Sequence, residues 1–173
     1  KSVLHEKMRS GEYIAAYAPY GYRKSEDNRH RLVVDEESAA VVRRMFDLRL
    51  TGMAYGKIAG VLNSEGLLSP PWYWARKYGK GSCRYAKLWR YATVKNVLTN
   101  ESYTGVLIQN RTGTRSYKDS TMICKPESEW MRHDGAHEAI ISPEVWAAVQ
   151  AIKKEPCSLL TVTLRRRSCS SAN

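Results

Sequence analysis

Two consecutive segments with helical periodicity, residues 36–51 and 54–65, constrain the fold of this chain more than any other feature of its sequence. Asp35 is typical of a helix N-cap, and the two acidic residues after it lie in the first turn, where they favour the helix dipole. Apolar residues recur on one broad face of the first segment and on one narrow stripe of the second. Gly52 and Gly66 predict where the two helices end. The first of these helices is expected to serve mostly as scaffold.

Shorter extended elements are predicted around this helical pair. Residues 18–24 and 32–34 are β-prone runs on either side of a polar turn, which predicts a hairpin. Residues 103–108 predict a further strand, and a loop is expected up to about Lys125. Residues 130–141 predict one or two more strands.

Short helices are predicted at three further places. Residues 1–10 are typical of the end of a helix that stops at Gly11, residues 93–100 form a short amphipathic helix, and Ser142 is the N-cap of another. The fold class predicted from these elements is α+β. We expect a small helical domain of three or four helices, two of them helix-turn-helix-like, with a small antiparallel β-sheet. Residues 156–173 are expected to form a disordered tail.

The net charge of the chain is +11, with an isoelectric point near 9.6, which indicates a polyanionic partner. That partner is either a nucleic acid or an anionic membrane surface. Hydrophobic residues make up 43% of the chain, which is enough for a folded core. No apolar run approaches the roughly 18 residues that cross a bilayer, and no secretory signal opens the sequence. A cytoplasmic protein without a membrane partner is therefore expected.

The positive charge is concentrated in residues 70–91, between the helices predicted at 54–65 and 93–100. This segment contains no Asp or Glu, and its basic residues alternate with seven aromatic residues. Lys and Arg bind phosphate oxygens, and aromatic rings pack on sugars or bases. The six basic residues of the segment are therefore expected to contact DNA phosphates: Arg76, Lys77, Lys80, Arg84, Lys87 and Arg90.

The expected conformation of this segment distinguishes between a nucleic acid and a membrane surface as the anionic partner. A membrane-binding protein would place such residues on an amphipathic helix, whereas the prolines and glycines here favour a loop. Several of the aromatic side chains, Trp89 above all, are expected to be buried in the core. An exposed basic loop without a ligand is the simpler alternative, and contact with duplex DNA is the favoured interpretation.

The helices on either side of the basic segment resemble a helix-turn-helix, in which the second helix presents side chains to base edges in the major groove. The connection is longer than the usual turn of about three or four residues, so the predicted arrangement is a variant. Asn pairs with adenine and Lys with guanine. The outward polar residues of the second helix are the candidates for base or near-base contacts: Thr93, Lys95, Asn96 and Thr99.

The cysteines and histidines give little support for a metal site. The four cysteines include no C-x-x-C pair, so no zinc ribbon is predicted and free thiols are expected. His133 and His137 form a weak candidate site with Cys124, because a second cysteine at ligand spacing is missing. We predict neither a metal nor a cofactor.

The order of several short motifs resembles the recombinase domain of large serine recombinases, which are integrases and transposases of phages and mobile elements. Each motif alone is modest, but their joint occurrence in this order is specific. The similarity covers about Gly11 to Lys154. It is carried by residues 18–22, 32–37, 40–46, 58–59 and 62–66, followed by Trp89, Thr93, Val94, Val97, Leu98, Asn100, Tyr103 and Gly105.

The resemblance implies sequence-specific binding of duplex DNA as part of a site-specific recombinase that integrates, excises or transposes mobile DNA. Enzymes of this family cut DNA with a serine in an N-terminal resolvase-like domain, and their protomers exchange strands as a tetramer. Residues 1–11 resemble the end of the helix that leaves that domain, and residues 12–155 resemble the recombinase domain. This chain is therefore expected not to be an enzyme by itself, and no catalytic residue is assigned.

Two further expectations come from the resemblance. Residues 11–22 are implied to follow the minor groove beside the crossover site, which would bring Tyr20, Arg23 and Lys24 to the DNA. Members of the family usually continue into a zinc ribbon with paired cysteines and a coiled coil. This chain lacks the paired cysteines, so zinc is not expected.

Two other functions stay open on the sequence. The alternating aromatic and basic residues also suit a module that binds RNA or single strands, with the rings as a stacking platform. A stand-alone enzyme would need a cluster of titratable residues, and the four histidines and scattered acids form none on the predicted elements.

Overall fold

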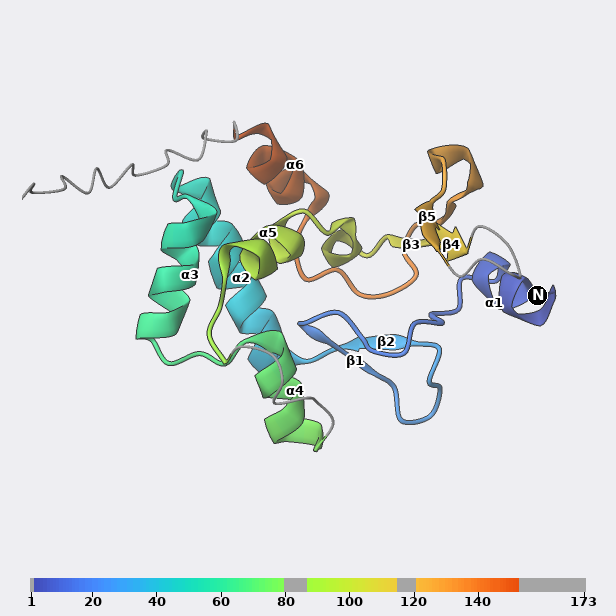
Figure 1. Cartoon of the computed structure of the whole chain (residues 1–173), viewed down its shortest axis with the longest axis horizontal. Helices are drawn as coiled ribbons and strands as arrows, with labels where there is room; N and C mark the ends of the chain where they lie inside the picture. Colours follow the sequence, from blue (N-terminus) through green and yellow to red (C-terminus); the bar gives the residue numbers. More distant parts are fainter. Residues whose placement is uncertain (1, 80–86, 115–120, 153–173) are drawn as a thin grey trace, which may run out of the picture.

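The computed structural model describes residues 2–79, 87–114 and 121–152 (Figure 1). Its α-helices and 3₁₀ turns are α1 (Ser2–Arg9), α2 (Glu36–Leu50), α3 (Tyr55–Ser64), α4 (Pro70–Tyr78), α5 (Tyr91–Leu98), η1 (Glu101–Thr104), η2 (Glu127–Glu129) and α6 (Pro143–Ala151). Its strands are β1 (Tyr22–Lys24), β2 (Leu32–Val34), β3 (Leu107–Gln109), β4 (Thr112–Thr114), β5 (Met122–Cys124) and β6 (Met131–His133).

The strands of the described residues pair as three separate antiparallel ladders. The predicted hairpin is confirmed: β1 pairs with β2, with Tyr22 opposite Val34 and Lys24 opposite Leu32. The strand β3 pairs with β6, and β4 pairs with β5. The predicted α+β class is confirmed, although the extended segments form ladders of two strands and not one sheet.

The core is built around α2, which lies between the other central helices and the β1–β2 hairpin (Figure 1). The apolar residues of α2 recur at helical spacing and therefore share one face of the helix. That face is buried in the core. The two helices of the predicted helix-turn-helix-like arrangement, α3 and α5, pack against each other and against α2. Side chains from these three helices form the most buried part of the core: Val42, Met45, Phe46, Ile58, Leu62, Val94 and Leu98.

Gly21 allows the β1–β2 hairpin to approach α2 closely. Its φ of +96° lies in the left-handed region, and a Cβ there would lie 2.9 Å from Ile140 Cδ1 and 3.2 Å from Val42 Cγ2. The flanking tyrosines then join the core. The hydroxyl of Tyr22 donates to the Glu138 carbonyl at 2.8 Å. The local sequence around Gly21 therefore fixes how the hairpin packs on the helical core.

The loop predicted across residues 70–91 is wrong in its first part, because residues 70–78 form α4. Ser69 is the N-cap, and Pro70 and Pro71 fill the first two helical positions. Proline is favoured there because those amides have no partner within the helix. Gly79, with φ of 60°, ends the helix in the left-handed conformation. The prolines that favoured a loop on the sequence thus mark the start of a helix.

Three smaller differences concern element boundaries. Helix α5 begins at Tyr91, two residues before the predicted start at Thr93. The strand predicted over 103–108 is realised only at its end, because η1 occupies residues 101–104 and Gly105 turns the chain with φ of 85°. The loop predicted up to Lys125 contains the β4–β5 hairpin. Helices α3 and α6 lie where the capping residues predicted them.

Candidate nucleic-acid interface

One side of α4 is held against the start of α2 by a cluster of ion pairs and hydrogen bonds. The ammonium of Lys77 lies 2.6 Å from a carboxylate oxygen of Asp35 and 3.1 Å from one of Glu37. Tyr73, one turn earlier on α4, is buried and donates its hydroxyl to Asp35 at 2.7 Å. Ser38 completes the cluster with a hydrogen bond of 2.8 Å to the same carboxylate. The anchor cluster, defined as Asp35, Glu37, Ser38, Tyr73 and Lys77, therefore holds α4 against the start of α2.

The charges of the anchor cluster stabilise one another. Burial alone would raise the pKa of Asp35, but hydrogen bonds from Lys77, Tyr73 and Ser38 outweigh it and hold that pKa below its ordinary value. Burial would likewise lower the pKa of Lys77, but its hydrogen bonds to Asp35, Tyr73 and Glu37 raise that pKa. Lys77, predicted to contact a DNA phosphate, therefore has its charge already paired with Asp35 and Glu37, although its side chain is 32% exposed.

A second side of α4 faces an open, mostly apolar cavity of about 470 Å³. Trp72 and Arg76 of α4 line it together with Leu68 and Lys87. The ammonium of Lys87 lies 5.9 Å from the centre of the Trp72 ring. The Arg76 side chain is 72% exposed, and its contact of 3.8 Å with Glu37 is a weak surface ion pair. Both cations are thus presented at the surface beside an aromatic ring.

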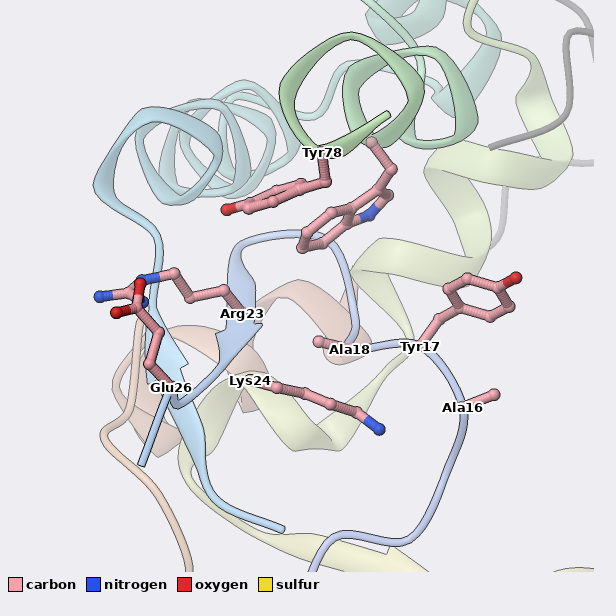
Figure 2. A pocket seen from close by; sticks show the side chains of 8 residues that line it. Ala16, Tyr17, Ala18, Arg23, Lys24, Glu26 and Tyr78 are labelled. Carbon is pink, nitrogen blue, oxygen red and sulfur yellow. The ribbon is translucent and has the colours of Figure 1, made fainter. Parts of the chain in front are cut away.

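A third side of α4 faces a cavity of about 280 Å³ that the β1 strand and residues 16–18 close (Figure 2). Trp74 and Tyr78 lie together on this side, with ring centres 4.8 Å apart and ring planes tilted by 31°. Figure 2 shows Tyr78 on one side of the cavity and Arg23 and Lys24 of β1 on the other. Arg23 pairs with Glu26 at 3.6 Å, and the Glu26 side chain is 93% exposed.

Helix α5 begins with exposed residues. Arg90 occupies its N-cap and is exposed. Along the helix, Asn96 and Thr99 are exposed, whereas Thr93 and Lys95 are half-buried. The Thr99 hydroxyl donates to the Lys95 carbonyl at 2.9 Å, which directs it back to its own helix. Asn96 is therefore the most accessible of the four residues predicted to contact bases.

Tyr20, predicted to contact DNA, is buried, with only 6% of the residue exposed. The Tyr20 ring packs edge-on against both Tyr73 and Trp89, with ring centres 5.4 Å and 5.3 Å away. The prediction that Trp89 is buried is confirmed. Lys80 and Arg84, the remaining predicted phosphate contacts, lie outside the described residues.

The two histidines of the weak candidate metal site bond to backbone carbonyls in the structure. The imidazole of His133 bonds to the Met8 carbonyl at 2.8 Å, and that of His137 bonds to the Ser102 carbonyl at 2.7 Å. Cys124 lies on the exposed β5 strand. Among the described residues, no group of three or more His, Cys, Asp and Glu side chains could hold a metal ion. Over the same residues, none of the helices has the length and apolar character needed to cross a membrane.

Sequence reasoning missed the pairing of Trp74 with Tyr78 and the exposure of two residues before and within α5. Leu88 is 58% exposed and Tyr91 is 52% exposed. The spacing of Trp74 and Tyr78, four residues apart, is the signal that places them on one side of a helix. That signal is usable only when residues 70–78 are recognised as helical.

A model of the recombinase family matches residues 36–156, which is well over half of the 173 residues. The chain belongs to the recombinase family. The match begins at α2 and includes α3, α4 and α5, which carry most of the candidate interface. The resemblance to the recombinase domain of large serine recombinases, predicted from the sequence, is confirmed.

Two solved structures share the fold of this recombinase-family chain. One was determined for work on the sequence requirements of the Listeria innocua prophage attP site; it matches 87% of this chain with a TM-score of 0.53 and 22% identity. The other is a large serine recombinase in complex with DNA; it matches 88% of this chain, again with a TM-score of 0.53 and 22% identity. The chain spans 49% and 38% of the lengths of those two proteins.

Proposed function

We propose that this recombinase-family chain binds duplex DNA sequence-specifically, as the DNA-binding domain of a site-specific large serine recombinase. The observation that carries the proposal is the group of exposed cations beside α4 and at the start of α5. Arg76 and Lys87 line one cavity, Arg90 caps α5, and Asn96 lies on the exposed side of the same helix. Cations at the surface next to an accessible polar helix face are what phosphate binding combined with base contact requires.

The family and the fold support this proposal. The large serine recombinase whose fold the chain shares is bound to DNA in its solved structure. By the same proposal, phosphates are contacted by cations of β1, α4 and the approach to α5, and bases by the outward residues of α5. The proposed phosphate contacts are Arg23, Lys24, Arg76, Lys87 and Arg90, with Lys80 and Arg84 from the segment between α4 and α5. The proposed base contacts are Thr93, Lys95, Asn96 and Thr99.

The proposal extends to the protein in which this domain works. The chain spans half or less of the two proteins whose fold it shares. We place residues 12–155 in the DNA-binding domain and residues 1–11 at the end of a helix that connects it to a catalytic serine domain. Strand cleavage and exchange are then the work of that second domain, in a dimer or tetramer of protomers.

Selection from a pool of random duplexes, followed by competition, tests the proposed function. The chain is incubated with the pool, retained duplexes are sequenced, and the enriched site is competed with each of its single strands. We expect a common motif and competition by duplex at a concentration at least ten times lower than by either single strand. Retention without an enriched motif would contradict sequence-specific binding.

A single-strand-binding module is the second candidate, and the neighbouring rings of Trp74 and Tyr78, which line the smaller of the two cavities beside α4, favour it. Base stacking on aromatic side chains is typical of proteins that bind single strands. Stronger competition by the single strands than by the duplex, in the experiment above, would select this function instead.

A further inference from the structure

Three sides of helix α4 have different surroundings. The anchor cluster fixes the rotation of the helix about its axis and therefore the direction of each side. Tyr73 and Lys77 point to the protein because they bond to Asp35. One residue of an α-helix turns the chain by about 100°, so Trp72 and Arg76 fall on one flank of that side and Trp74 and Tyr78 fall on the other. The anchor therefore separates the aromatic residues of α4 into two groups that face away from each other.

Each flank of α4 lines a cavity of similar chemistry. The first cavity combines Trp72 with two cations, Arg76 and Lys87. The second combines the neighbouring rings of Trp74 and Tyr78 with two other cations, Arg23 and Lys24. Both cavities are open to the surface and have more apolar than polar lining. An aromatic wall beside two cations suits a sugar–phosphate strand, because rings pack on sugars and cations bind phosphates.

We infer that the two cavities hold the two sugar–phosphate strands of a single DNA duplex, so that α4 bridges a groove between them. This inference rests on the proposed function, since it assumes duplex binding and assigns the strands. The diameter of an α-helix with its side chains, about 10–12 Å, suits a bridge between the strands that border the major groove, which is about 12 Å wide. One helix thereby contacts both strands of the duplex.

The side of α4 opposite the anchor explains why this helix bridges strands and does not read bases. Helical spacing places Pro71 on that side, and places Ala75 between Pro71 and the first cavity, which Ala75 also lines. Neither side chain has a hydrogen-bond donor or acceptor, so neither can distinguish one base pair from another by hydrogen bonding. Base contacts are left to α5, where Asn96 is exposed. The division gives α4 a positioning task and α5 the sequence readout.

Arg23 and Arg76, one cation in each cavity, can exchange their present partners for phosphate. Arg23 pairs with Glu26 at 3.6 Å, and Arg76 pairs with Glu37 at 3.8 Å, and all four side chains are exposed. Exposed ion pairs at such distances contribute little, so a phosphate between the cation and solvent replaces them readily. Lys77 differs because its partner Asp35 is buried, and it stays with the protein when DNA binds.

Site-specific photocrosslinking tests the strand assignment. A benzoylphenylalanine replaces Tyr17, which lines the second cavity and is 71% exposed, or Lys87, which lines the first. Each full-length variant is irradiated on its selected duplex with one strand labelled at a time. We expect the probe at position 17 to crosslink one strand and the probe at position 87 to crosslink the complementary strand.

Met122 is the control position for the photocrosslinking experiment. The same probe in place of Met122, which is 64% exposed on the β4–β5 hairpin away from α4 (Figure 1), should crosslink neither strand. Crosslinks from positions 17 and 87 to the same strand, or from only one position, overturn the bridge while leaving DNA binding intact. If the unmodified chain retains no duplex in a mobility-shift assay, the proposed function fails, and the strand assignment fails with it.

Charge-removal variants provide a second measurement. Paired substitution of Arg23→Ala with Lys24→Ala, or of Arg76→Ala with Lys87→Ala, removes two phosphate contacts from one strand. Each pair should reduce the slope of log K against log salt by about 2, since each phosphate contributes about 0.9. A slope that is unchanged by either pair would show that its cavity holds no phosphate strand, which overturns the bridge.

Discussion

Arg76 and Lys77 are neighbours in the sequence, yet their charges have different uses because they project from different sides of α4. Lys77 lies 2.6 Å from the buried carboxylate of Asp35, whereas Arg76 makes one surface contact of 3.8 Å with Glu37. The positive charge of a segment therefore does not show how many of its cations are available to a ligand. Helix geometry decides that, residue by residue.

Replacement of Lys77 should affect stability and leave the phosphate contacts unchanged. Lys77→Met removes the partner of a buried carboxylate, so we expect a loss of about 1–3 kcal/mol in the free energy of unfolding, measured by urea denaturation. Arg76→Ala is the matched control: its stability should change by less than about 0.5 kcal/mol, while its salt slope for DNA binding falls by about 0.9. Equal loss of salt slope in both variants would contradict the anchor assignment.

Asn96 is the residue on which sequence readout is predicted to depend most. Asn96→Ala should narrow the discrimination between the selected site and its variants by roughly 1–3 kcal/mol, because Asn pairs with adenine through two hydrogen bonds. The measurement is a set of Kd values for single-base variants of the site. Uniform weakening on all sequences would show that Asn96 does not read a base.

At the scale of the elements, local sequence signals predicted the helices that carry their own start and stop signals. Asp35 and Gly52 lie at the two ends of α2, and Ser142 caps α6 because its hydroxyl oxygen accepts a hydrogen bond from the Val145 amide. The β1–β2 hairpin was predictable because two β-prone runs enclose a polar turn. Each of these signals lies within a few residues of the element it defines.

The elements that were predicted wrongly depend on context. Pro70 and Pro71 favour either a loop or the first turn of a helix, and the choice depends on Tyr73 and Lys77 finding Asp35, more than thirty residues earlier in the chain. The prediction of the candidate site also depends on the contact between α4 and Asp35. Its cations could be named from the sequence, but which of them face solvent could not be known before α4 was placed.

Gly21 tests how tightly the hairpin packs on the core. Gly21→Ala combines a left-handed φ of +96° with a Cβ contact of 2.9 Å to Ile140, so we expect a loss of about 2–5 kcal/mol in the free energy of unfolding. Gly52→Ala is the matched control, because Gly52 has a φ of +84° and no atom within 4 Å of the added Cβ. It should cost only about 1–2 kcal/mol. Equal losses in urea denaturation would refute the close packing at Gly21.

At the scale of the whole molecule, the half-buried histidine His137 links stability to pH. Burial lowers the pKa of His137 more than its hydrogen bond to the Ser102 carbonyl raises it, and the ring packs edge-on against Tyr22 at 4.8 Å. The folded state therefore binds fewer protons at this site than the unfolded state, in which the histidine pKa is about 6.5. This contribution to stability is complete above that pH and is lost as the pH falls below it.

The matching measurement is urea denaturation of the whole chain at pH 7.5 and pH 5.5. We expect lower stability at pH 5.5, and His137→Gln should reduce the difference between the two values because glutamine does not titrate. An identical pH dependence in the variant would show that His137 is not the linked group.

Over the whole molecule, the cations at the surface are proposed to bind the phosphates of duplex DNA. The net charge of +11 alone does not establish this, since Lys77 shows that part of the charge is paired internally. The number of phosphates contacted distinguishes DNA binding from a basic surface without a ligand. The described residues offer five candidate cations: Arg23, Lys24, Arg76, Lys87 and Arg90.

A salt titration of DNA binding measures that number directly. In mobility-shift assays on the selected duplex between 50 and 300 mM salt, the seven proposed phosphate contacts, which are these five cations with Lys80 and Arg84, predict a slope of log K against log salt of about −6. A slope close to zero would show that binding does not release counterions from the duplex, and it would contradict the account.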